Sequence, residues 1–138
     1  MLNFKTSILK EIIVELNSIK IRAYGTSMEP TIKNNDILNI TPVDSIDVGD
    51  IFLYKRNYDL LCHRLVNKTN LLYMKGDNEN FIDIINPNDI IGKYTYKKID
   101  NSITVDYNYS YKNYKFKVNI VDGILEKIEV ENEYYRGK

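Results

Sequence analysis

The sequence VGDIFLYKR, residues 48–56, begins with a Gly-Asp turn and continues as an apolar and aromatic run. Such a run is typical of a strand in the centre of a sheet. Further strand-like segments separated by polar turns flank it on both sides: DILNI (36–40), DLLCHRLV (59–66), NLLYMKGD (70–77) and NPNDIIGKYTYKKI (86–99). This pattern predicts a mainly β domain.

The two ends of the chain differ from this central part. The first 21 residues place apolar side chains at helical spacing, namely Ile8, Leu9, Ile12, Ile13, Leu16 and Ile19. At the other end, KFKVNIV (115–121) and ILEKIEV (124–130) flank Asp122-Gly123, which predicts a β-hairpin. We therefore expect a mainly β (α+β) fold with three parts: an N-terminal helix (1–21), a coiled or barrel-like β-sheet core (22–100) and a C-terminal β extension (101–138).

The N-terminal segment is not suited to crossing a membrane. Charged residues interrupt its apolar positions, so no run approaches the roughly 18 apolar residues that a span requires. These residues are Lys5, Lys10, Glu11, Glu15 and Lys20. The continuous apolar core of a secretory signal peptide is also absent. We predict a soluble, cytoplasmic protein with the helix packed on its own domain; the alternatives are binding to a membrane surface or docking on a partner.

Composition narrows the classes of function. At 138 residues the chain is long enough for one domain with a buried core. Its 19 basic and 19 acidic residues balance without a block of like charge, so we expect no nucleic-acid partner. One cysteine and one histidine exclude a disulfide framework and argue against a zinc site. We predict neither a metal nor a cofactor.

The segment GTSMEPT, residues 25–31, places Ser27 where neither a helix nor a strand would run smoothly. Glycine frees the backbone and proline stiffens it, so we expect Ser27 on a bent, exposed loop. Such a loop suits a nucleophile, although short turns with Ser and Pro are common. The interpretation depends on a base that can activate the hydroxyl group.

His63 is the one histidine of the chain, and it lies in the predicted strand 59–66. A strand histidine is either a hydrogen-bonded structural residue or a base. Cys62 beside it cannot pair with it, because successive strand side chains point to opposite faces, and we interpret Cys62 as a core residue. Two carboxylates follow in KGDNENFID, Asp77 in a turn and Asp83 beyond it. Serine, histidine and carboxylate are the side chains of serine-triad chemistry, but most proteins of this size contain all three.

The order of the motifs is more specific than any one of them. GTSMEPT, VGDIFLYK, CHRLV, YMKGDNENFID and IIGK resemble the catalytic core of type I signal peptidases and the related self-cleaving SOS repressors. The likeness covers about half of the chain, residues 20–95. Most bacterial members have a lysine immediately before the arginine that is Arg64 here. His63 in that place resembles the endoplasmic-reticulum-type branch, which uses a serine and a histidine.

The resemblance implies a role for each candidate residue. Ser27 would be the nucleophile, with its backbone N–H in the oxyanion hole, and His63 the general base. Asp83 would contact and orient the histidine. Asp77 would shape the site, and we expect it mainly to cap the backbone of its own turn. Some relatives carry a hydroxyl group two residues before the serine, where this chain has Gly25.

The chain lacks two features of the family, so the resemblance implies the catalytic chemistry without implying the same substrate. Signal peptidases have transmembrane anchors, and the repressors carry a helix-turn-helix and an internal cleavage segment; we find neither pattern in this sequence. We therefore expect a signal-peptidase-like serine endopeptidase that binds a peptide or protein as an extended strand. The alternatives are a leader peptidase that matures a ribosomally synthesised peptide and a catalytically silent peptide-binding module on the same fold.

Overall fold

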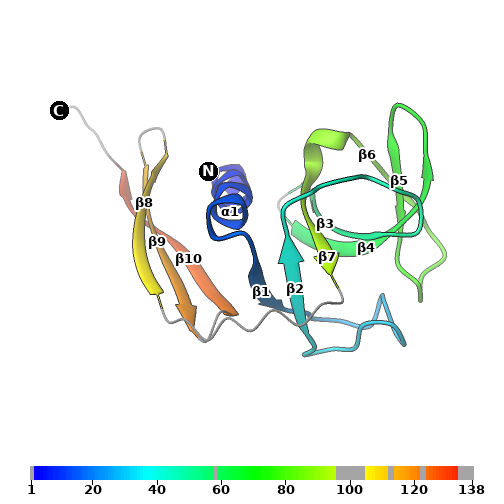
Figure 1. Ribbon diagram of the computed structural model, residues 1–138, viewed down its shortest axis with the longest axis horizontal. Coiled ribbons are helices and arrows are strands. Elements are labelled where there is room, and N and C mark those ends of the chain that lie inside the picture. Colours follow the sequence, from blue (N-terminus) through cyan, green and yellow to red (C-terminus); the bar gives the residue numbers. More distant parts are fainter. Residues whose placement is uncertain (1, 58, 96–104, 112–113, 122–123, 134–138) are drawn as a thin grey trace.

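The computed structural model describes residues 2–57, 59–95, 105–111, 114–121 and 124–133. It contains one α-helix, α1 (Leu2–Leu16), followed by strands and one short 3₁₀ helix, η1 (Pro87–Asp89) (Figure 1). The strands are β1 (Ile19–Arg22), β2 (Ile37–Thr41), β3 (Ile51–Arg56), β4 (Asp59–Lys68), β5 (Leu72–Lys75), β6 (Asp83–Ile85), β7 (Ile90–Thr95), β8 (Val105–Tyr111), β9 (Tyr114–Val121) and β10 (Ile124–Glu133). The mainly β fold with an N-terminal helix is confirmed.

The strands form one 10-stranded sheet in the order β6-β5-β4-β3-β7-β2-β1-β10-β9-β8. As predicted, β3 is an inner strand, antiparallel to both β4 and β7. Its side chains alternate between two hydrophobic clusters: Ile51 and Leu53 belong to one, and Phe52 and Tyr54 to the other. Because both faces of β3 are buried, its sequence is apolar without interruption. The strands β2 to β7 curl into a barrel-like unit (Figure 1). The buried residues of the second cluster come from five of these strands, β3 to β7.

Helix α1 packs on this unit through the apolar positions expected from the sequence. Ile8, Leu9, Ile12 and Ile13 are almost completely buried and join the first cluster, which also includes residues of β1, β2 and β3. Figure 1 shows α1 between the barrel-like unit and the C-terminal strands. The helix ends at Leu16, not at residue 21, because Asn17 adopts a left-handed conformation with φ 68°. Residues 19–22 form the unexpected strand β1.

The C-terminal extension contains the expected hairpin. β9 and β10 pair in antiparallel register with Ile124 opposite Val121, while the turn residues 122–123 lie outside the described residues. β8 adds a third strand that the sequence did not predict, and β10 joins the main sheet by parallel pairing of Ile124 with Lys20 on β1. The expected domain boundary at residue 100 falls among residues 96–104, which also lie outside the described part.

Candidate active site

The loop between β1 and β2 presents Ser27 as the sequence predicted. Gly25 has φ 95°, a backbone conformation that residues other than glycine rarely adopt. The hydroxyl-bearing residue found at this position in some relatives would therefore be strained. Met28 and Ile32 are both 4% exposed and fix the loop to the core of the domain. Ser27 itself is half-buried, because its neighbours anchor the backbone and leave its side chain at the surface.

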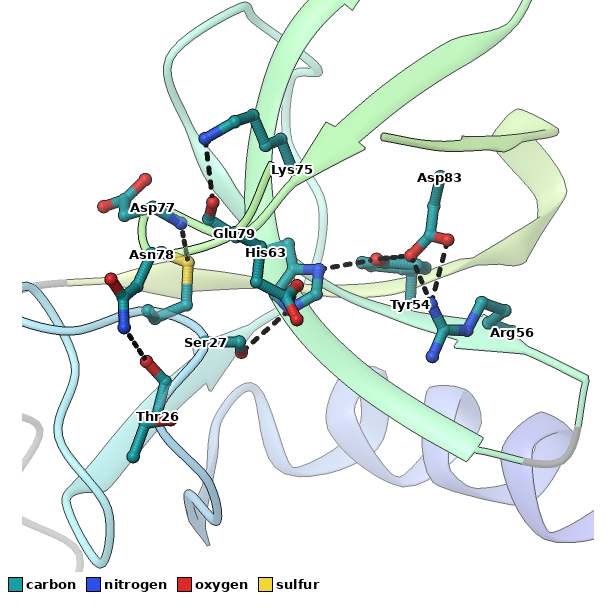
Figure 2. Close-up of polar contacts among 12 residues, drawn as sticks. Thr26, Ser27, Tyr54, Arg56, His63, Lys75, Asp77, Asn78, Glu79 and Asp83 are labelled. Atoms are coloured by element: carbon teal, nitrogen blue, oxygen red, sulfur yellow. Dashed lines mark hydrogen bonds and ion pairs between the residues drawn. The ribbon is translucent and has the colours of Figure 1, made fainter. Parts of the chain in front are cut away.

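Four side chains form a continuous hydrogen-bonded chain that starts at Ser27 (Figure 2). Ser27 Oγ lies 3.0 Å from Nε2 of His63, and His63 Nδ1 lies 2.9 Å from the hydroxyl oxygen of Tyr54. Tyr54 in turn donates to Oδ2 of Asp83 at 2.6 Å. The structure thus brings Ser27 and His63 into direct contact, whereas the expected direct contact between Asp83 and His63 is replaced by a link through Tyr54.

The direction of these hydrogen bonds follows from Asp83. Burial raises the pKa of this carboxyl group, but hydrogen bonds from Tyr54 and Arg56 outweigh that effect and hold its pKa below the ordinary value. Asp83 is therefore ionised at neutral pH and can only accept, so the Tyr54 proton points toward it. The Tyr54 oxygen is then left to accept the Nδ1 proton of His63. A neutral imidazole carries one proton, which leaves Nε2 bare and able to accept from Ser27.

The surroundings keep His63 neutral and Tyr54 protonated. His63 is 3% exposed, and burial lowers the pKa of its imidazole, against the opposing charges of Glu79 and Asp83. Burial, followed by the hydrogen bond to Asp83, raises the pKa of the Tyr54 phenol. A neutral imidazole is the form that can accept a proton from serine.

Arg56 completes this end of the site. Its Nη1 lies 2.9 Å and 3.0 Å from the two carboxylate oxygens of Asp83. Arg56 and Tyr54 stand two positions apart on β3, so both side chains reach the same face of the sheet. The negative charge of Asp83 is therefore balanced by Arg56. Asp83 interacts with the imidazole of His63 through the hydroxyl group of Tyr54, which lies between them.

Asp77 has a different set of partners. Nε and Nη2 of Arg64 donate to its two carboxylate oxygens at 2.9 Å and 2.8 Å, and Thr31 Oγ1 donates at 2.6 Å. The hydrogen bond from Arg64 is the main reason why the pKa of Asp77 is lowered. The expectation that Asp77 caps its own turn is wrong, because its side chain instead ties the serine loop to β4.

The turn of residues 76–79 fixes the backbone of the serine loop by hydrogen bonds. The N–H of Asn78 donates to the carbonyl oxygen of Ser27 at 2.8 Å, and its side chain donates to Thr26 O at 3.1 Å. A Cβ atom at Gly76 would stand 2.6 Å from that same carbonyl oxygen, so only glycine permits this approach. Among the described residues, no hydrogen bond uses the backbone N–H of Ser27, the group expected in the oxyanion hole.

Cys62 faces away from His63, as the alternation of strand side chains predicted. It stands opposite Leu53 and packs against the first hydrophobic cluster, whereas His63 stands opposite Phe52 on the other face. Burial raises the pKa of the Cys62 thiol to about 12, so the thiolate is not populated at neutral pH. Cys62 is therefore not a competing nucleophile.

A cavity of about 350 Å³ opens beside Ser27 and His63. One wall is formed by residues 21–25, which end β1 and lead into the serine loop, and the other by residues 60–63 of β4. Leu9, Leu38, Leu53 and Leu125 contribute to an apolar lining. β5 pairs with β4 only between Arg64 and Lys68, so the backbone of β4 before His63 has no described strand on that edge.

The described residues contain neither a metal-binding cluster nor a helix able to span a membrane. No group of three or more His, Cys, Asp or Glu side chains is placed to hold a metal ion in this part of the chain. None of the helices in the same ranges has the length and apolar character needed to cross a membrane.

Sequence analysis did not identify Tyr54, Arg56 and Glu79 as site residues. The two-residue spacing of Tyr54 and Arg56 places both on one face of the predicted central strand, which was a partial signal. The register that sets Tyr54 diagonally from His63 is visible only in the structure. Glu79 carried no such signal. Its carboxylate oxygen Oε1 lies 3.6 Å from His63 Nε2 because the 76–79 turn brings it there.

Comparison with protein families supports the resemblance found in the motifs. The family model described as Peptidase S24-like matches residues 5–95, well over half of the chain. Searches of curated proteins and of solved structures gave no significant match. The matched region contains most of α1, the serine loop, the strands β1 to β7 and all four side chains of the Ser27–Asp83 chain. This protein belongs to the Peptidase S24-like family.

Proposed function

We propose that this protein is a serine endopeptidase that cleaves a peptide or protein segment through Ser27 and His63. The observation that carries the proposal is the 3.0 Å contact between Ser27 Oγ and His63 Nε2. The contacts of Tyr54 with His63 Nδ1 and Asp83 favour the tautomer in which Nε2 accepts from the serine. Family membership alone does not require this geometry. A peptide-binding module has no need of a buried imidazole held in the base tautomer.

The chemistry follows from the direction of the hydrogen bonds. Ser27 Oγ attacks the carbonyl carbon of the scissile bond while its proton moves to His63 Nε2. The Ser27 N–H is suited to stabilise the oxyanion. The imidazolium then gives its Nε2 proton to the leaving amine, and an acyl-enzyme remains on Ser27. Water, deprotonated by the same nitrogen, attacks the ester and releases the acid, which restores the serine.

The substrate would lie as an extended strand between the two walls of the cavity. The unpaired edge of β4 before His63 and the segment that leads from β1 to Ser27 supply backbone groups for such a strand. Tyr24 and Leu60 line the cavity and are 79% and 43% exposed, so a bound peptide would cover apolar surface. The family resemblance implies small side chains before the scissile bond.

Cleavage of a diverse peptide library, read by mass spectrometry, tests this proposal. The wild-type protein should generate new termini that share a sequence preference, and Ser27→Ala should generate none while its melting temperature stays nearly unchanged. The exposed Ser45→Ala is the matched control and should cleave normally. If wild type binds library peptides without cutting them, the protein is a binding module. If Ser27→Ala cuts at the wild-type rate, Ser27 is not the nucleophile.

A further inference from the structure

Glu79 places a buried carboxylate oxygen beside the catalytic base. Its Oε1 atom lies 3.6 Å from His63 Nε2, the nitrogen that also faces Ser27 (Figure 2). Among the buried side-chain nitrogen and oxygen atoms of the described residues, Oε1 is the one without a hydrogen-bond partner. An unpartnered buried carboxylate oxygen is costly, so its position needs an explanation.

The turn that anchors Ser27 also fixes Glu79. The N–H of Glu79 donates to Gly76 O at 3.0 Å, and Oε1 lies 2.9 Å from the point where a Cβ of Gly76 would stand. The same missing Cβ admits the Ser27 carbonyl oxygen. Glu79 is thus held against the site by the backbone that positions the nucleophile.

In the resting state Glu79 has nothing to accept from His63. The tautomer set by Tyr54 and Asp83 leaves Nε2 without a proton, and 3.6 Å is longer than a hydrogen bond. Once Nε2 takes the serine proton, the imidazole becomes positively charged and Nε2 becomes a donor. Glu79 therefore gains a partner only in the charged state of His63, which forms during the reaction.

The other charged groups around His63 are already balanced. Asp83 is paired with Arg56 and separated from the ring by the Tyr54 hydroxyl group, and Asp77 is paired with Arg64. The side chain of Glu79 is 26% exposed, so water screens part of its charge. It is nevertheless the carboxylate nearest to the imidazole nitrogen that receives the proton.

We propose that Glu79 is a positioning residue that stabilises the imidazolium form of His63 from the Nε2 side. The expected effect of Glu79 on the cleavage rate rests on the proposed peptidase function. The effect of Glu79 on the pKa of His63 can be measured without any substrate. Glu79 thereby takes over from Asp83 part of the charge stabilisation that a directly bonded carboxylate gives in a serine triad.

Because His63 is the only histidine, its imidazole resonances can be titrated by NMR in the whole protein without ambiguity. A negative charge favours the protonated ring, so removing it should lower the pKa of His63. We expect a decrease of about one pH unit in Glu79→Gln, at the low end for a charge this close because the carboxylate is partly exposed. Glu79→Leu, which cannot donate to Nε2, should give the same direction, and the exposed Glu15→Gln should give no change.

Kinetics provide the second measurement. At its pH plateau Glu79→Gln should cleave about tenfold more slowly, and the acid limb of its kcat/KM profile should move to lower pH. An unchanged His63 titration in both Glu79 variants would overturn the proposal, as would a lowered pKa with a wild-type rate and pH profile. If the titration shifts as expected but wild type cleaves no peptide, the peptidase function fails while the electrostatic pairing stands.

Discussion

The two ends of the segment from Asp77 to Asp83 use the same residue types for different purposes. Each end has an aspartate held by an arginine, Arg64 at one end and Arg56 at the other. The third partner distinguishes them. Asp77 accepts from Thr31 and so fixes the loop that carries the nucleophile, whereas Asp83 accepts from Tyr54 and so sets the tautomer of the base. The spacing of the motif alone does not show which aspartate fixes the serine loop and which one orients the histidine.

Among changes that test this comparison, the largest expected effect is that of Asp83→Asn on the rate. Without the charge, the Tyr54 hydroxyl is free to donate to His63 Nδ1, which leaves the imidazole proton on Nε2, where it blocks acceptance from Ser27. We expect kcat to fall on the order of 10²-fold, with little change in stability because Arg56 can turn to solvent. Nitrogen chemical shifts of the single histidine should report the tautomer change.

Asp47→Asn, at an exposed position, is the matched control for that variant and should leave both rate and tautomer unchanged. A wild-type rate in Asp83→Asn would show that the carboxylate does not act through Tyr54. The two ends of the segment would then both be structural.

Tyr54→Phe should have a smaller effect on the rate, on the order of tenfold. The change removes the acceptor for Nδ1–H but supplies no competing donor, so the imidazole is left less well oriented and its proton can occupy either nitrogen. The loss of a buried acceptor should also destabilise the protein by about 1–3 kcal/mol. Activity assays and urea unfolding of the same preparations separate the two effects, and a wild-type rate would exclude Tyr54 from the relay.

For Asp77→Asn the expected effect is on stability. The variant loses the charge that receives two hydrogen bonds from Arg64, and we expect the free energy of unfolding to fall by about 2 kcal/mol. The rate of the folded fraction should fall less than tenfold, because the contact between Ser27 and His63 does not involve Asp77. A strong loss of rate with unchanged stability would exchange the roles of Asp77 and Asp83.

The smallest effect is the pH dependence of that stability difference. The pKa of Asp77 is lower in the folded protein than its ordinary value of 3.8, so its stabilisation is present above that pH and is lost as the pH falls through the folded value. The difference in unfolding free energy between wild type and Asp77→Asn should therefore be constant from pH 5 to 7 and shrink below about pH 4. If the difference in unfolding free energy persists at pH 2, it arises from side-chain packing and not from the charge of Asp77.

Local sequence pattern was sufficient to predict three kinds of element: the central strand, the N-terminal helix and the C-terminal hairpin. The apolar run of β3, the helical spacing of Ile8, Leu9, Ile12 and Ile13, and the hairpin of β9 and β10 all follow from periodicity and turn residues. Ser27 and His63 were likewise identified from a loop and a strand, together with the motif order. The short strand β1 was missed because Ile19 fits the helical spacing of the residues before it.

The relay could not be predicted because it depends on register. Tyr54 reaches His63 only in the observed register of β3 and β4, in which Phe52 stands opposite that histidine. A slip of one residue would turn Tyr54 to the other face. Glu79 depends on even less local information, since its approach to Nε2 requires the close packing of Gly76 against the serine loop. The orientation of a site therefore needs coordinates even where its reactive residues can be recognised in the sequence.

The central claim is that His63 activates Ser27, and covalent labelling with an alkyl fluorophosphonate tests it most directly because it needs no knowledge of the substrate. Peptide mapping of the labelled wild-type protein should find a single adduct, on Ser27, with a rate that falls as acid protonates His63, whose pKa burial holds below the ordinary value of 6.5. Ser27→Ala and His63→Ala should remain unlabelled under the same conditions. Equal labelling of Ser27 in wild type and His63→Ala, or no adduct on Ser27 in the folded wild-type protein, would contradict the account.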